Sequence, residues 1–172
     1  DLPVKNESER LAVLLNAVER HLEVADVMIL EDYDKGVLLE PAALIAASAN
    51  YDVPVVVDPK AKPISEYRNS NIVKPNEKEF RGLSELEKTG FSEAARELCS
   101  ELNIENIVIT LGDDGMSVND SKVSYHVPAR PVDVFDVTGA GDTAVAVMGL
   151  GLAMGMEAQD FVQLANLASS LV

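Results

Sequence analysis

The sequence predicts an α/β fold of three layers, in which a mostly parallel sheet is flanked by helices on both faces. Short apolar runs that are typical of buried strands alternate four times with segments of helical periodicity, which indicates crossover connections between parallel strands. A turn-rich link between two further short runs predicts a β hairpin late in the chain. Together these patterns exclude an all-helical or an all-strand domain.

The first half of the chain supplies two helices and two strands. Apolar residues recur at helical spacing between Leu11 and Leu22, with charged residues on the opposite face, so we expect an amphipathic helix there. Pro41 favours the start of a second helix, because proline is well tolerated at a first helical position. The apolar runs 25–30 and 53–57 are the strands expected beside these helices.

The second half continues the alternation and then changes pattern. We expect strands at 71–74 and 106–110 on either side of an amphipathic helix at 92–102. The runs 116–118 and 123–127 are the two arms of the hairpin. A run at 132–137 leads into a glycine-rich loop, and two helices follow, from about 141 to 154 and from 158 to the end.

Composition and charge limit the classes of partner. The net charge of −15 argues against nucleic acid and anionic membranes, which both need a positive protein surface. Any bound phosphate must therefore be held locally, by backbone amides, a few lysines and a metal ion. Cys99 is the single cysteine, so no disulfide forms within the chain, and its apolar surroundings predict a core residue. With no signal peptide or membrane span in the pattern, we expect a cytoplasmic protein.

The two ends of the sequence suggest that the domain is incomplete. The chain starts on a helix with no strand before it and stops inside a helical pattern. We therefore expect residues 1–172 to be the later part of a single domain, a fragment that lacks the first strands.

The stretch DVTGAGDT, residues 136–143, carries the strongest chemical signal. Small residues before a helix let backbone N–H groups converge on an anion, where the helix dipole adds positive charge. Asp142 falls in the first helical turn, where a carboxylate would repel a passively bound phosphate. It suits a base that takes a proton from a hydroxyl group attacking that phosphate. The alternative is that Asp142 only caps the helix.

The same letters also fit the dinucleotide fingerprint G-x-G-x-x-A, which would indicate an NAD-dependent oxidoreductase. That motif requires a following strand that ends in an acid about 20 residues on. Asp160 has this spacing, but the intervening residues are helical in pattern. The context therefore favours phosphoryl transfer over hydride transfer.

The glycine stretch resembles the C-terminal signature of the ribokinase-like (PfkB) carbohydrate kinases. The resemblance implies that Asp142 is the catalytic base and that Gly139, Ala140 and Gly141 form the anion hole. It implies a ribokinase-like fold whose missing front part carries the N-terminal strands and a lid. It also implies ATP and Mg²⁺ as cofactors, leaves a monovalent cation open, and suggests a homodimer for the intact protein.

Other segments match this family in the same order. Asn76 and Glu79 resemble an N-x-x-E motif that organises Mg²⁺ through water, although they also fit the start of a helix. The remaining matches are on the nucleotide side, where the resemblance assigns contacts with ATP to Lys60, Thr110, Gly112, Gly115 and Asn166. Asp32 and Lys35 follow a predicted strand, at the end where such sheets bind ligands, and are expected to face the sugar.

A narrower resemblance is to the heptose 7-phosphate kinase domain of ADP-heptose synthases. It rests on LEDYDKGVL, VVVDPK, YR and VKPN together with the glycine stretch. It implies phosphorylation of D-glycero-D-manno-heptose 7-phosphate at the anomeric hydroxyl to the 1,7-bisphosphate, a step towards the lipopolysaccharide core. The alternatives are another PfkB sugar kinase, such as a ribokinase or fructokinase, an NAD-dependent oxidoreductase, and a catalytically silent nucleotide-binding module.

Overall fold

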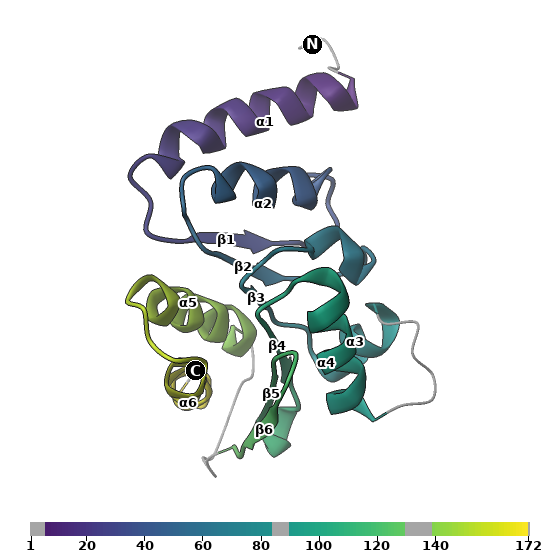
Figure 1. Cartoon of the computed structure of the whole chain (residues 1–172), viewed down its shortest axis with the longest axis vertical. Helices are drawn as coiled ribbons and strands as arrows, with labels where there is room; N and C mark the ends of the chain where they lie inside the picture. The colour runs from purple at the N-terminus through teal and green to yellow at the C-terminus, as the bar shows by residue number, and fades with distance from the viewer. Residues whose placement is uncertain (1–5, 84–89, 130–138, 172) are drawn as a thin grey trace.

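The computed structural model describes residues 6–83, 90–129 and 139–171. Within these residues six strands form one sheet, in the order β1-β2-β3-β4-β5-β6 (Figure 1). The first four pair in parallel and the last two pair antiparallel, so the predicted α/β fold with its late hairpin is confirmed. The strands are β1 (Met28–Glu31), β2 (Val55–Asp58), β3 (Ile72–Val73), β4 (Asn106–Thr110), β5 (Met116–Asn119) and β6 (Ser124–Val127).

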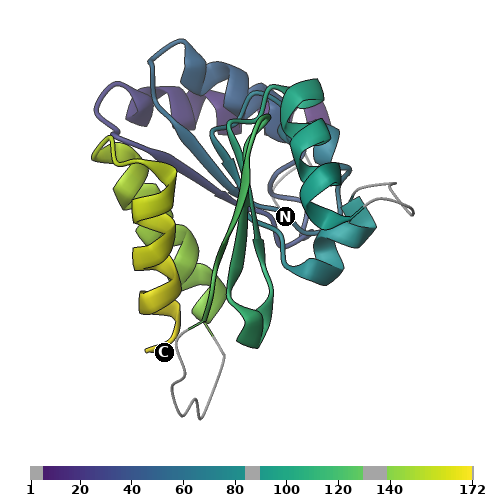
Figure 2. The ribbon, with the colours of Figure 1, turned by 60° about the horizontal axis from the view of Figure 1, so that its bottom comes forward.

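Helices cover both faces of the sheet (Figure 2). On one face lie α1 (Glu7–Leu22), α2 (Pro41–Ala49), α3 (Glu77–Leu83) and α4 (Phe91–Leu102). On the other face lie α5 (Ala140–Ala153) and α6 (Ala158–Ser169). Two short 3₁₀ helices, η1 (Ile64–Tyr67) and η2 (Gly112–Asp114), were not expected from the sequence. The predicted run at 132–137 lies outside the described residues.

The central strands are buried on both faces, which explains their unbroken apolar runs. Val55 and Val57 of β2 belong to the core cluster beneath α1, α2 and α4. Val56, between them, belongs to the second cluster beneath α5 and α6. Successive side chains of a strand point to opposite faces, so a single strand contributes to both cores.

Cys99 lies in the first of these cores, as the sequence predicts. Its side chain is buried on α4, and burial raises the pKa of its thiol to about 12. The thiol donates to the backbone carbonyl of Asn119 on β5, with an Sγ–O distance of 3.4 Å. Since the thiolate is the reactive form, this cysteine is a core residue rather than a nucleophile.

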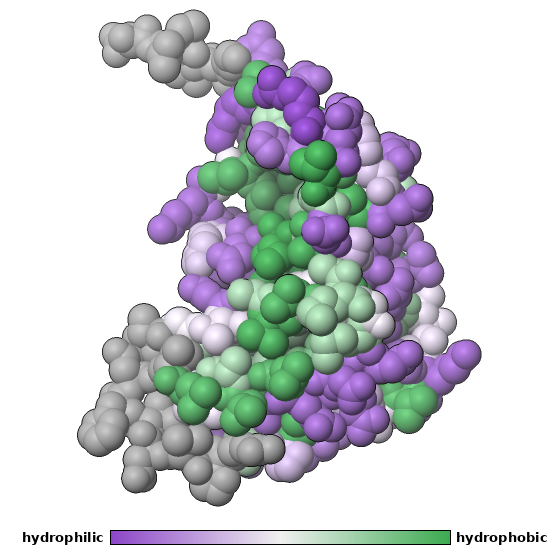
Figure 3. Space-filling view, turned by 90° about the vertical axis from the view of Figure 1, so that its left-hand side faces the viewer, coloured by the Kyte–Doolittle hydropathy of each residue, from purple (hydrophilic) through white to green (hydrophobic). Residues whose placement is uncertain are grey.

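One side of the molecule carries a band of apolar side chains (Figure 3). The exposed large apolar residues include Ile29 on the edge strand β1, Leu150 on α5 and Met154, the residue that follows α5. In the described parts of the chain, no helix combines the length and the apolar character that a membrane crossing needs.

Packing between α5 and α6 depends on a glycine. A Cβ atom added to Gly151 would lie 2.3 Å from the Cβ of Phe161, closer than real Cβ atoms approach each other. Gly82 on α3 makes a matched comparison, because a Cβ added there meets nothing within 4 Å. The close contact between α5 and α6 therefore requires a glycine at position 151, whereas no contact requires one at position 82.

We expect Gly151→Ala to destabilise the protein by about 1–3 kcal/mol, the usual cost of overpacking a core. Gly82→Ala should leave the free energy of unfolding unchanged or raise it by up to about 1 kcal/mol, because alanine is the better helix former. Urea unfolding of both variants measures the difference. Equal stabilities for the two would contradict the proposed role of Gly151.

Candidate active site

Parallel pairing brings the residues that follow β1, β2 and β3 to one edge of the sheet. Glu31 at the end of β1 pairs with Asp58 at the end of β2. Val57 pairs with Val73, which places Lys74 beside Asp58. A further parallel bridge joins Asn76 to Thr110 at the end of β4. In open α/β sheets this carboxyl edge is where ligands bind.

Helix α5 begins with an open, glycine-rich turn. Gly139 is its N-cap residue with φ of 90°, a conformation that favours glycine, and a Cβ there would meet nothing within 4 Å. Among the described residues, no side chain caps this helix, so N–H groups of its first turn are available to a ligand. Asp142 lies in that turn and is exposed. Residues 136–138 of the glycine stretch lie outside the described residues.

Lys74 brings a positive charge to the start of α5. Its side chain is only 4% exposed, and its Nζ atom lies 3.1 Å from Oδ2 of Asp58. A Cβ atom built on Gly141 would lie 3.7 Å from the same Nζ. The ammonium group of Lys74 therefore lies within van der Waals reach of the first turn of α5. Sequence reasoning did not select Lys74, because its position depends on the register of β2 and β3.

Several carboxylates face the same region. Burial raises the pKa of Asp58 to about 6, and the charges of Glu79 and Glu31 add to the rise, while Lys74 opposes it. The pKa of Tyr33 is raised by its hydrogen bond to Glu31, and then by the charges of Glu31, Asp142 and Asp58. The catalytic candidate Asp142 therefore shares its surroundings with the ends of β1 and β2.

Asn76 and Glu79 form a reciprocal capping box at the start of α3. The backbone N–H of Glu79 donates to Oδ1 of Asn76 at 2.8 Å, and that of Asn76 donates to Oε2 of Glu79 at 2.9 Å. Lys60 donates to the other oxygen, Oε1 of Glu79, at 3.0 Å. This confirms the helix-start interpretation and brings the expected metal and phosphate residues together. No group of three or more acidic, histidine or cysteine side chains in the described residues could hold a metal alone.

The two residues expected to face the sugar have different environments. The side chain of Asp32 is 3% exposed and both of its oxygens accept hydrogen bonds. Lys35 is exposed, and its Nζ atom lies 5.8 Å from the centre of the Tyr33 ring. Lys35 is thus placed to contact a ligand, whereas Asp32 is engaged within the protein.

The residues expected on the nucleotide side form two groups. Thr110 ends β4 and donates its N–H to Pro75, and Gly112 follows in an open turn with φ of 59°. Gly115 instead packs against the backbone, since a Cβ there would lie 2.1 Å from the carbonyl oxygen of Val127. Asn166 on α6 donates to the carbonyl of Pro128 at 2.8 Å. Gly115 and Asn166 therefore have structural reasons for their identity, whatever they contact in a complex.

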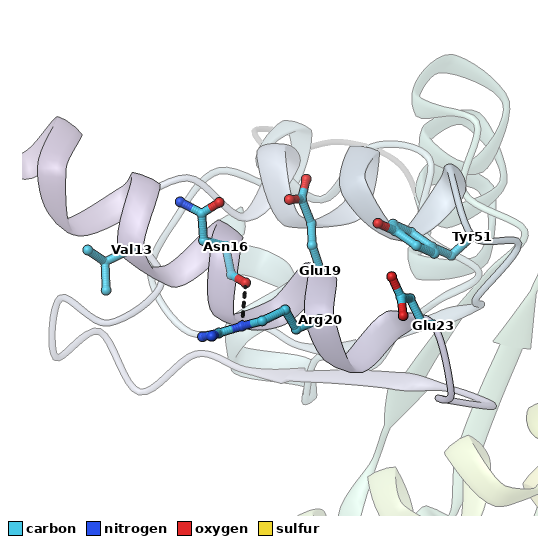
Figure 4. A pocket seen from close by; sticks show the side chains of 6 residues that line it. All are labelled: Val13, Asn16, Glu19, Arg20, Glu23 and Tyr51. Atoms are coloured by element: carbon cyan, nitrogen blue, oxygen red, sulfur yellow. Dashed lines mark hydrogen bonds between the residues drawn. The ribbon is translucent and has the colours of Figure 1, made fainter.

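A separate pocket of about 580 Å³ lies on the outer surface of α1 (Figure 4). Its walls come from α1 and from the turn after α2, and include Val13, Asn16, Glu19, Arg20, Glu23 and Tyr51. None of the residues at the carboxyl edge lines it. It holds no feature that suggests phosphoryl-transfer chemistry.

The unusual pKa of Asp58 gives a direct test of this site. Since the carboxyl normally titrates near 3.8 and here near 6, the folded state binds the proton more tightly than the unfolded chain. The contribution of Asp58 to the free energy of unfolding therefore falls as pH rises from 3.8 to about 6. We expect Lys74→Met to raise the pKa of Asp58 further, because the neighbouring positive charge is lost.

Carbon-13 chemical shifts of the aspartate carboxyl groups, followed by NMR against pH, measure both values. Lys78→Met is the control, because Lys78 is an exposed lysine on α3 that does not contact Asp58. A midpoint for Asp58 near 3.8 in the unmodified protein would contradict the buried, crowded site described above.

Residues 4–172 match the family described as pfkB family carbohydrate kinase. Two curated relatives are bifunctional proteins HldE, from Halorhodospira halophila and Pseudomonas aeruginosa strain LESB58. The first is 38% identical over 94% of this chain, and the match covers 34% of the relative's length. The second is 38% identical over 99% of this chain, and the match covers 36% of the relative's length. The chain thus covers about a third of these relatives.

Solved structures give the same fold. Phosphofructokinase-2 from Escherichia coli, in complex with potassium, superposes with a TM-score of 0.78 at 28% identity, over 91% of this chain and 54% of that one. Arabidopsis thaliana ribokinase, complexed with ribose and ATP, has a TM-score of 0.76 at 23% identity over 91% and 52%, a likeness of fold alone. With a matching family profile over nearly all its residues, the chain belongs to the pfkB family of carbohydrate kinases.

Proposed function

We propose that this chain is the nucleotide-binding and catalytic part of a single ribokinase-like domain that transfers a phosphoryl group from ATP to a sugar hydroxyl. The observation that carries the proposal is the start of α5. There an exposed carboxylate, Asp142, lies in a first helical turn that no side chain of the described residues caps, and the ammonium group of Lys74 lies near Gly141 in the same turn. A base and an anion-binding site side by side are what in-line phosphoryl transfer requires.

In this mechanism Asp142 accepts the proton of the acceptor hydroxyl as its oxygen attacks the γ-phosphorus of ATP. The bond from that phosphorus to the bridging oxygen breaks, and ADP leaves with the electron pair. Backbone N–H groups of Ala140 and Gly141, together with Lys74, stabilise the charge on the transferred group. Each preorganised donor of this kind contributes a few kcal/mol in comparable sites.

The residues at the carboxyl edge fit a magnesium ion that arrives with ATP. Mg²⁺ keeps several waters and is usually held by one or two carboxylates plus substrate phosphates. Glu79 and Asn76, already locked by their capping box, would hold its water ligands, and Lys60 would lie next to the phosphates. The bound ion supplies neutralisation of the phosphate charge. Asp58 and Glu31 add negative charge at the same edge.

The acceptor that we propose is D-glycero-D-manno-heptose 7-phosphate, phosphorylated at the anomeric hydroxyl. The support is the narrower resemblance to ADP-heptose synthases and the sequence identity of 36–38% with HldE proteins over most of this chain. Another PfkB acceptor, such as fructose 6-phosphate or ribose, is the second candidate, since phosphofructokinase-2 is similar in structure. Family membership favours all of these over an NAD-dependent oxidoreductase. We extend the proposal to a homodimer and to activation by a monovalent cation.

The base assignment is tested by Asp142→Asn in the intact protein. We expect kcat to fall by about 10²–10⁴-fold, the usual contribution of a general base, while ADP binding stays within about twofold. ATP consumption is measured against heptose 7-phosphate, fructose 6-phosphate, fructose and ribose. Turnover that survives the substitution would rule out Asp142 as the base, and turnover with a different sugar would replace the heptose assignment.

Glu79→Gln separates the metal role of Glu79 from its structural role. Glutamine also completes a capping box, so the free energy of unfolding should change by less than about 0.5 kcal/mol. The lost negative charge should raise the Mg²⁺ concentration for half-maximal activity by roughly tenfold. A titration of activity with Mg²⁺, alongside thermal unfolding, checks both. An unchanged Mg²⁺ requirement would leave Glu79 as a helix cap only.

A further inference from the structure

Asp32 is a buried carboxylate at the edge of the candidate site, and it is fully used within the protein. It follows β1, is 5% exposed, and accepts three hydrogen bonds. Burial favours a higher pKa for this group, but the hydrogen bonds from Lys62, the Asp34 amide and Tyr67 outweigh it and lower the pKa. The side chain is therefore an ionised acceptor whose partners define its role.

The three donors come from two separate segments. Oδ1 of Asp32 accepts from the Asp34 amide at 2.9 Å, within the loop that follows β1. Oδ2 accepts from Lys62 Nζ at 2.8 Å and from the Tyr67 hydroxyl at 3.1 Å, in the segment between β2 and β3. Tyr67 is completely buried, so this segment is anchored in the core. One carboxylate thus joins two loops that are adjacent only in the folded chain.

The loop after β1, residues 33–37, has a fixed shape. Asp34 and Gly36 adopt positive φ angles of 54° and 74°, so the backbone makes two uncommon turns within three residues. Arg10 on α1 donates to the carbonyl of Gly36 at 2.7 Å and holds the far end of the loop. Asp32 holds the near end. Between these two anchors the loop carries Tyr33 and Lys35, which are both exposed.

Tyr33 is the residue that connects this loop to the chemistry. Its hydroxyl donates to Oε2 of Glu31 at 3.1 Å. Glu31 pairs with Asp58, and Asp58 contacts Lys74, whose Nζ atom lies near Gly141 at the start of α5. Tyr33 therefore lies at the same edge of the sheet as the proposed base. A base must touch the acceptor hydroxyl, and exposed groups next to it therefore border the acceptor. Lys60, on the other segment, has a backbone hydrogen bond with Tyr67, but its ammonium group is held by Glu79.

We propose that Asp32 and Lys62 are positioning residues, which clamp the loop 33–37 against the segment between β2 and β3 and thereby fix the acceptor side of the active site. This inference rests on the proposed kinase function. Asp32 itself touches neither substrate, because its oxygens are already engaged. The clamp acts more on the acceptor than on ATP, since Tyr33 lies on the loop it holds, whereas the ammonium group of Lys60 is held by Glu79.

The experiment compares Lys62→Met, Lys62→Arg and Asp32→Asn in the intact protein. We expect Lys62→Met to raise KM for the acceptor by at least about tenfold, since misplacing a group by an ångström can cost on the order of 10²-fold. KM for ATP should stay within about twofold, and Lys62→Arg should restore the acceptor KM, because arginine keeps the charge. The acceptor is heptose 7-phosphate, or the sugar that the panel above shows to be phosphorylated.

A second measurement does not depend on turnover. Amide hydrogen exchange of residues 31–38 should become faster in Lys62→Met and in Asp32→Asn, but not in the control Arg81→Met. That control removes an exposed ion pair with Glu77 on α3 and a contact with the Phe91 ring, and it leaves the three hydrogen bonds of Asp32 in place. If heptose 7-phosphate is not a substrate, the clamp is still tested by hydrogen exchange and by KM for the sugar that the protein does phosphorylate.

Three results would overturn the clamp. The first is unchanged exchange in residues 31–38. The second is an equal rise in KM for ATP and for the acceptor. The third is a loss of activity that follows the melting temperature in every variant, including the control. The first and third results would show a buried ion pair that serves only stability, and the second would show that the ion pair does not act selectively on the acceptor. Because Asp32→Asn risks misfolding, Lys62, whose side chain is 21% exposed, provides the variant that keeps the test decisive.

Discussion

The ion pair between Lys74 and Asp58 joins the ends of two neighbouring parallel strands beneath the first turn of α5. A buried lysine is tolerated only when a partner offsets its desolvation, and the register of β2 and β3 supplies that partner. The ammonium group lies next to Gly141 in the first turn of α5. The position of this cation therefore depends on the strand register and on the ion pair. A shift of either strand would remove the cation from the helix start.

Much of the fold follows from local patterns in the sequence. The strand at 106–110 was predicted with the bounds that the structure has, and α6 starts at Ala158 as expected. These patterns succeed because burial on one or two faces imposes a simple periodicity. The sequence also predicts a phosphate loop with Asp142 and its glycines, since such a loop requires consecutive residues, and this role stays a prediction. The residues that predict each of these features lie within a few positions of one another in the sequence.

Other features depend on contacts between distant residues. Asp32 meets Tyr67 across 35 positions and Lys62 across 30, and no local pattern indicates that its carboxylate is enclosed. The glycines also differ in cause, although they look alike in sequence. Gly139 provides a positive φ at an open helix start, whereas Gly115 is needed because the backbone of Val127 lies against it. Only the three-dimensional structure, including the register of the sheet, shows which of these two reasons applies to a given glycine.

The charge balance at the carboxyl edge explains how an acidic protein could handle a nucleotide. Lys74 and Lys60 are each paired with a carboxylate, Asp58 and Glu79 respectively. Glu31 and Asp142 add negative charge near the same place. A bare polyphosphate approaching this edge would meet a net negative field, and the amides of α5 offset only part of it. We therefore expect the site to prefer a phosphate donor that brings its own divalent cation over a free anion that would compete for the helix start. In a chain of net charge −15, selectivity of this kind follows from local pairing rather than from a positive surface.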